Sequence, residues 1–162
     1  MSAMLRTLTL LLTLFGAGAA LAGDLMVMGQ WVREAPPGSQ ALAGYMMVHN
    51  HGKQDRKLVA AESPAFDHVE LHRSVFEGGM ARMVPQDFMP IPAGGQLELK
   101  PGDYHLMLIK PKQALKAGDT VEMTLRFDDG STLKTTFPVK KGEGGMEGMQ
   151  MHDHEHMHGT PQ

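Results

Sequence analysis

Two histidines and two methionines stand at a spacing that suits a soft metal ion. In chain order they are His72, Met83, His105 and Met107. The intervals between them give the pattern H-x10-M-x21-H-x-M. Thioether sulfur is a soft ligand that never carries a proton, and neutral imidazole is borderline. Two ligands of each kind suit Cu(I), bind hard cations poorly and attract zinc less than thiolates do. We call these four residues the histidine–methionine site.

Composition offers a simpler interpretation of the same residues. The chain has 15 methionines and 9 histidines among 162 residues, and methionine commonly fills irregular gaps in protein cores. Met107 lies in an apolar run and, taken alone, has the character of a core residue. Each histidine, taken alone, is more often structural than a ligand. The joint spacing of the four positions is what favours a shared metal ion.

That spacing resembles the signature of the PCu(A)C family of periplasmic copper chaperones. The sequence around it is similar to the family over Val69–His72, Gly79–Met83, Ile91–Gly95 and Pro101–Leu108. The resemblance extends from about Met26 to about Val139 and places the family's Cu(I) ligands on the histidine–methionine site. It implies a cupredoxin-like Greek-key β-sandwich. It also implies delivery of Cu(I) to the copper centre of cytochrome c oxidase, directly or through a thioredoxin-like assembly factor.

The first 22 residues have the pattern of a secretory signal peptide. Arg6 supplies the positive charge, residues 8–15 form the apolar stretch, and Ala20-Leu21-Ala22 is an A-x-A cleavage site. The alternative is a membrane anchor, but the apolar stretch is shorter than the roughly 20 residues that span a bilayer. We therefore expect cleavage near Ala22, a periplasmic location, and a single β-domain over residues 23–141.

The chain contains no cysteine and has a formal net charge of −3. Without thiolates it can be neither a blue-copper carrier nor a binuclear thiolate-bridged copper centre. It also cannot be a thiol–disulfide oxidoreductase. No basic block occurs, so nucleic acid is not an expected partner.

Short strands separated by turns are predicted for the whole domain. Residues 121–127 carry apolar side chains at every odd position, which is typical of a strand with one buried face. Asp128-Asp129-Gly130 is predicted to form a hairpin turn, and residues 133–139 the returning strand. Further strands are expected at residues 45–49, 57–61, 67–73, 97–99 and 104–109. Turn signals recur between these short strands, which favours an antiparallel sandwich or barrel.

Strand geometry predicts how the ligands are presented. Residues 105 and 107 point to the same face, about 6.6 Å apart along their strand. His72 is expected on another strand, where it shares a face with Glu70 and His68. Residues 74–91 show little alternation, so Met83 is predicted to lie on a long loop or an irregular hairpin over the metal.

Most of the remaining histidines and methionines of the domain are expected to have other roles. His49, His51 and His68 lack matching partners and are predicted to be surface residues. Met80 is close enough to Met83 to be an accessory sulfur ligand. The core is the more natural place for the methionines at other strand positions, namely Met26, Met28, Met46, Met47 and Met123.

Residues 142–162 form a second metal-binding candidate, predicted to be a disordered tail. Its eight potential donors are Met146, Met149, Met151, His152, His154, His156, Met157 and His158. Such a tail could take Cu(II) through imidazoles and Cu(I) through thioethers. The alternative is a solvated low-complexity tail or the remnant of a tag.

The sequence therefore predicts a periplasmic Cu(I)-binding metallochaperone that is not an enzyme. One alternative is a periplasmic protein for copper buffering or resistance, with the tail as its main store. A copper-dependent enzyme is a further alternative. No HExxH sequence, P-loop or nucleotide fingerprint occurs, and four protein ligands leave no open position for a substrate.

Overall fold

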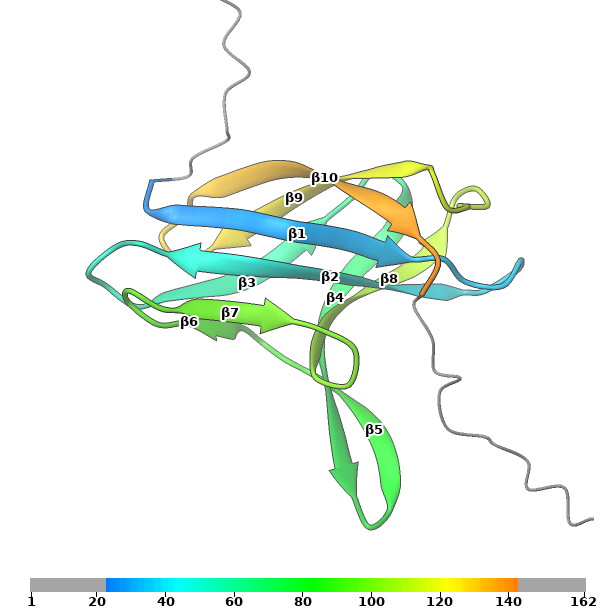
Figure 1. Cartoon of the computed structure of the whole chain (residues 1–162), viewed down its shortest axis with the longest axis horizontal. Helices are drawn as coiled ribbons and strands as arrows, with labels where there is room; N and C mark the ends of the chain where they lie inside the picture. The colour runs from blue at the N-terminus through cyan, green and yellow to red at the C-terminus, as the bar shows by residue number, and fades with distance from the viewer. Residues whose placement is uncertain (1–22, 143–162) are drawn as a thin grey trace, which may run out of the picture.

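The computed structural model describes residues 23–142, and all of its regular elements are β-strands (Figure 1). The strands are β1 (Leu25–Arg33), β2 (Ala41–Asn50), β3 (Arg56–Glu62), β4 (Phe66–Glu77), β5 (Met80–Pro85), β6 (Met89–Ile91), β7 (Gln96–Leu99), β8 (Tyr104–Pro111), β9 (Thr120–Phe127) and β10 (Thr132–Lys140). Among the described residues, no helix is long and apolar enough to cross a membrane. The predicted signal peptide and the eight donors of the predicted tail lie outside the described residues.

The strands form two layers that join along one pair. The first layer has the order β5-β4-β8-β2-β1, with β7 paired to the second half of β2, and the second has the order β10-β9-β3-β6. Strands β1 and β10 connect the layers as a parallel pair, with Val32 opposite Val139. Every other pair within residues 23–142 is antiparallel. The predicted all-β class is therefore confirmed, with one parallel pair that the sequence did not indicate.

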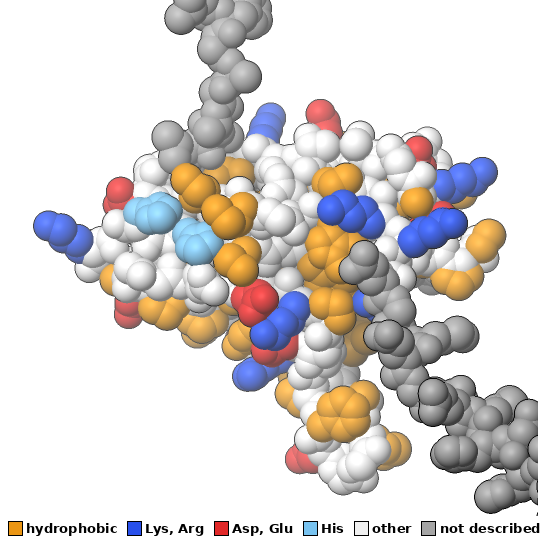
Figure 2. Space-filling model, in the orientation of Figure 1, with side chains coloured by type: hydrophobic (Ala, Val, Ile, Leu, Met, Phe, Trp, Pro, Cys, Tyr) orange, Lys and Arg blue, Asp and Glu red, His pale blue; other side chains and the backbone are white. Residues whose placement is uncertain are grey.

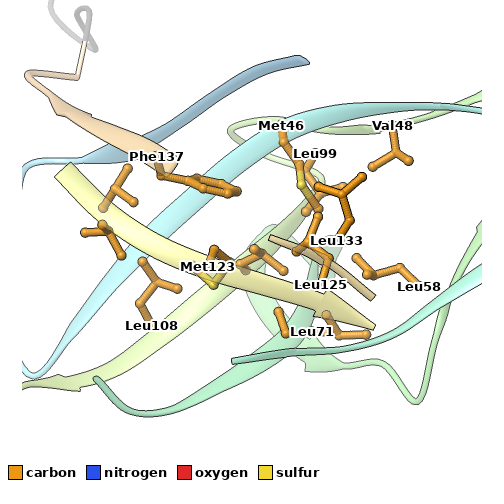
Figure 3. Packing of buried hydrophobic residues seen from close by; sticks show 14 of the residues in the cluster. Met46, Val48, Leu58, Leu71, Leu99, Leu108, Met123, Leu125, Leu133 and Phe137 are labelled. Atoms are coloured by element: carbon orange, nitrogen blue, oxygen red, sulfur yellow. The ribbon is translucent and has the colours of Figure 1, made fainter. Parts of the chain in front are cut away.

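The hydrophobic core lies between the layers (Figure 3). From the second layer, β9 directs its odd-numbered side chains inward, and Leu125 is completely buried. From the first layer, Leu106 and Leu108 of β8 are also completely buried. The intervening residues of β8 point away from the core because successive side chains of a strand alternate between faces. One face of β8 thus holds the core, and the other is free to carry ligands.

The β9–β10 hairpin agrees with its prediction. Gly130 has a φ of 81° at the turn, which a residue without a Cβ adopts at no steric cost. Leu133, Phe137 and Val139 of the returning strand are buried. Burial of one face made this hairpin visible in the sequence.

The segment after residue 74 is more regular than expected. Strands β4 and β5 form an antiparallel hairpin with Ser74 opposite Met83, and this hairpin projects from the sandwich (Figure 1). The long-loop alternative for Met83 is therefore wrong, because Met83 lies within a strand. Alternation is missing because almost all side chains of β5 are exposed. A strand with no buried face has no reason to alternate in polarity.

Three of the five predicted core methionines are not in the core. Met46 and Met123 are buried as predicted. Met26 and Met28 are instead 36% and 41% exposed, and Met47 is half-buried on the outer face of β2. The reason is register: Met26 and Met28 flank Val27, which packs against the core, so they point outward.

Candidate metal centre

The two histidines of the histidine–methionine site face each other across the β4–β8 pair. His72 lies directly opposite His105, and Glu70 lies directly opposite Met107. Opposed residues of an antiparallel pair project to the same face, as do residues two apart on one strand. All four side chains therefore share the face opposite the core. Leu71 and Leu106, which alternate with them, are the buried residues that hold this part of the sheet against the core.

The imidazole rings are close together and removed from water. Their centroids are 5.9 Å apart with an interplanar angle of 56°. His72 is 7% exposed and His105 is 4% exposed. Two buried rings at this separation can present nitrogens to one small ion.

Hydrogen bonds assign the proton of each ring. His72 donates from Nε2 to Glu70 Oε2 over 2.7 Å, since an ionised carboxylate only accepts. His105 donates from Nδ1 to the carbonyl oxygen of Asp103 over 3.0 Å, since a carbonyl also only accepts. In neutral rings the lone pairs then reside on His72 Nδ1 and His105 Nε2. These two nitrogens are buried and have no hydrogen-bond partner in the described structure.

A buried nitrogen without a hydrogen-bond partner is unfavourable unless it binds another group, such as a metal ion. A buried polar atom without a partner typically costs about 1–3 kcal/mol. Metal-binding histidines usually donate the other ring N–H to a carboxylate or a backbone carbonyl, which orients the free lone pair. Glu70 and the carbonyl of Asp103 occupy those positions here. The two imidazoles therefore have the arrangement of a preformed pair of metal ligands.

The two methionines of the site differ in their burial and in their position relative to the histidine pair. Met107 is half-buried and lies diagonally across from His72 on the shared face. Met83 is 58% exposed on the projecting hairpin, diagonally across from His72 on its other side. Register places Met80, opposite Glu77, on the face away from Met83. Met83 is thus the outlying member of the site, and the register argues against Met80 as an accessory ligand.

A chain of hydrogen bonds runs outward from His72. Glu70 Oε1 lies 3.1 Å from His68 Nε2, and His68 Nδ1 lies 3.0 Å from Asp67 Oδ2. The hydrogen bond from His72, with a further one from His68, lowers the pKa of the Glu70 carboxyl group. The ionised Glu70 therefore stabilises the folded state at neutral pH, and this contribution is lost as the pH falls through the lowered pKa. The predicted surface position of His68 is correct, because half of its side chain is exposed.

The donor types at this position favour a soft ion. Within residues 23–142, no three His, Cys, Asp or Glu side chains are grouped so as to hold a metal. The other two side chains of the histidine–methionine site, Met83 and Met107, supply thioether sulfur. Imidazole with thioether is a combination that suits Cu(I).

The hydrogen-bond acceptors of the two histidines differ in how far the sequence could predict them. The shared face of Glu70 and His72 follows from strand alternation, but their direct contact does not. The acceptor for His105 is a backbone carbonyl at Asp103, to which any residue type could contribute. No sequence signal could have identified it.

Comparison with solved structures places this sandwich among PCuAC domains. The Cu(I)-bound solution structure of DR1885 from Deinococcus radiodurans is 37% identical, covers 78% of this chain and 83% of its own, and has a TM-score of 0.61. The copper-bound PCuAC domain from PmoF2 is 22% identical, covers 74% and 95%, and has a TM-score of 0.64, which shows a shared fold. The protein is thus a cupredoxin-like β-domain of the PCuAC class, as the sequence resemblance implied.

The particular family follows from the sequence match. The model of the LpqE-like family, described as putative lipoprotein LpqE-like, matches residues 25–139, and the chain belongs to this family. The putative lipoprotein Lxx21020 of Leifsonia xyli subsp. xyli is 38% identical over 127 residues, which are 78% of this chain and 75% of that protein.

Proposed function

We propose that the protein is an exported copper chaperone that binds one Cu(I) at the histidine–methionine site. The observation that carries this proposal is the pair of buried, unpartnered nitrogens, His72 Nδ1 and His105 Nε2. Their positions on one sheet face with Met107, and the copper-bound PCuAC relatives, support copper as the ion. The names of the lipoprotein relatives support export, and we propose the periplasm as the location.

The unequal burial of the ligands suits release of the ion as well as binding. The two histidines are fixed on paired strands of the sandwich, whereas Met83 stands on an exposed hairpin. Neutral thioethers are weak donors and form no ion pairs that must be broken. Thiolates of an acceptor could replace the methionines first and the histidines afterwards. The ion keeps its oxidation state throughout, and no proton transfer to sulfur is needed. This is a binding and transfer function, in which no substrate is transformed.

We propose that the acceptor is the copper centre of cytochrome c oxidase or a thioredoxin-like assembly factor. A deletion strain separates delivery from buffering. Delivery predicts loss of oxidase activity at low copper, restored by added copper. Buffering or resistance predicts normal oxidase activity and sensitivity to high copper. The second result would replace delivery with buffering while leaving Cu(I) binding intact.

The ligand assignment is tested by X-ray absorption of the Cu(I) form, prepared anaerobically from a chain that ends at residue 141. Mixed sulfur and nitrogen scatterers are expected at one equivalent of copper. A shell of nitrogen and oxygen alone would contradict the assignment.

Comparison with the full chain tests whether residues 142–162 are a second copper store, because their eight donors should add copper equivalents and most of the Cu(II) binding. If both chains bind equal copper, these residues are not a store.

Removal of the Glu70 carboxylate should weaken copper binding without removing a ligand. In Glu70→Ala, His72 Nε2 loses its acceptor and the imidazole is free to rotate or to change tautomer. The expected loss is about 10–100-fold in Cu(I) affinity, measured by competition with a chromophoric Cu(I) chelator. Glu70→Gln should lose less, because its amide oxygen still accepts from Nε2. Equal losses in the two variants would mean that the hydrogen bond does not position His72.

A further inference from the structure

A second group of soft donors lies on the outer face of β1 and β2. Register places Met26 opposite His49 and Met28 opposite Met47. All four side chains point away from the core, because they alternate with Val48, which is in the core, and with Val27, which packs against it. We call these four residues the β1–β2 methionine cluster.

The pairing fixes the dimensions of this cluster. Directly opposed residues of an antiparallel pair have Cβ atoms about 4.5–5.5 Å apart, and residues two apart on one strand are separated by about 6.6 Å. The four donors thus occupy the corners of a small rectangle. Methionine has three rotatable bonds beyond the backbone, so sulfurs at these corners can converge on one point. A bulge follows Met28, with Gly29 at a φ of 61°, and ends this run of the ladder.

Two of the donors are already in contact. His49 Nε2 lies 3.0 Å from Met47 Sδ. Because a thioether sulfur only accepts, His49 Nε2 donates this hydrogen bond to Met47 Sδ. An ion bound here would take the place of that proton, and the neutral imidazole would then carry its proton on Nδ1. The ring of His51 stacks on that of His49, with centroids 6.0 Å apart and an interplanar angle of 10°.

The position of these side chains is unusual for a solvated sheet face. The outward face of an antiparallel sheet is commonly polar, yet Met26 and Met28 rank among the exposed large hydrophobic residues of the described structure. Figure 2 shows two histidine side chains beside a group of hydrophobic ones on this face. A methionine on a solvated face contributes little packing, but its sulfur is accessible to an ion.

We propose that the β1–β2 methionine cluster is a second binding site for a soft monovalent ion, Cu(I) or Ag(I), with three thioethers and one imidazole as donors. It shares no ligand with the histidine–methionine site. Both sites lie on the outer face of the same layer, since Met107 is opposite Ala43 of β2. Ala43 and Met47 are about 13 Å apart along β2, from a rise of 3.3 Å per residue. The second site is therefore a separate position on the same surface.

Residue-resolved titration tests this proposal on the full chain. Methionines labelled with ¹³C at the ε-methyl group are observed by NMR while Ag(I) is added without oxygen or halide. We expect the methyl signals of Met26, Met28 and Met47 to shift together at the same ratio of silver to protein. The ring signals of His49 should shift in step with them. Independent or absent shifts would overturn the proposal.

Two variants at neighbouring positions show whether the joint shift of the methyl signals comes from metal binding. Met47→Leu keeps an apolar side chain but removes one sulfur, so the joint shift of Met26 and Met28 should need at least about tenfold more Ag(I). Met46→Leu is the matched control: Met46 is adjacent in sequence but buried in the core, and its loss should leave the shift unchanged. An unchanged response in Met47→Leu would overturn the site.

The same spectra keep this proposal apart from the proposed function. The methyl signals of Met83 and Met107 report on the histidine–methionine site. If they respond and the cluster does not, the second site is wrong and the first stands. If only the cluster responds, the histidine–methionine site is wrong and the second site stands.

Discussion

His105→Ala should weaken Cu(I) binding at the histidine–methionine site by about 100-fold or more, because loss of a group that merely positions a ligand already costs about 10–100-fold. The variant removes one of the two buried nitrogens that lack a partner. It leaves Met107 and the backbone of β8 in place. The measurement is a chelator competition in which the Met107 ε-methyl signal reports occupancy of this site. Folding should be preserved, since the outward-facing ring is not part of the hydrophobic core.

His51→Ala is the control for this experiment. His51 directly follows β2, outside the histidine–methionine site, and no described contact joins it to His72 or His105. Its removal should leave the Met107 signal and the affinity at this site unchanged. Equal losses in the two variants would mean that His105 has no specific role as a ligand.

Leu106→Ala should destabilise the protein by about 2–5 kcal/mol, the cost of emptying a leucine site in a core. Leu106 is completely buried and lies between the two ligands of β8, with Leu71 opposite it on β4. Domains of this size are stable by only about 5–15 kcal/mol, so the loss is a large fraction of the total. Equilibrium unfolding in urea measures it as a lower midpoint with an unchanged slope.

Ile109→Ala is the comparison for Leu106→Ala. Ile109 lies on the opposite face of the same strand and is only half-buried. Its truncation removes a similar number of atoms from a more exposed place, and should therefore cost less than half as much. A larger loss for Ile109 than for Leu106 would show that the faces of β8 are assigned the wrong way round. The ligand face would then be wrong as well.

Strand alternation made much of the fold predictable. Residues 121–127 have one buried face, so polarity alternates and the sequence reveals β9 almost to its ends. The sequence did not clearly predict the β4–β5 hairpin, because β5 has no buried face that would make polarity alternate along it. The parallel pairing of β1 with β10 joins strands from opposite ends of the domain. Such pairing depends on the packing of the whole sandwich and leaves no local signal.

The donor types of the candidate site and their order follow from the amino-acid sequence alone. The four-residue spacing predicted His72, Met83, His105 and Met107 as ligands without reference to any contact, and the two-residue interval placed His105 and Met107 on one face. These conclusions depend only on side-chain chemistry and the period of a strand, which are local properties.

Which nitrogen of each histidine is free, and which methionines are accessible, depends on how the strands pair and pack. The free nitrogens follow from acceptors at Glu70 and Asp103, and the two histidines face each other only because β4 pairs with β8 in one register. Met46 and Met47 differ by one position along β2, yet one is buried in the core and the other meets His49 on the surface. A shift of one residue in pairing reverses every such assignment, so register and burial are properties of the assembled sheets.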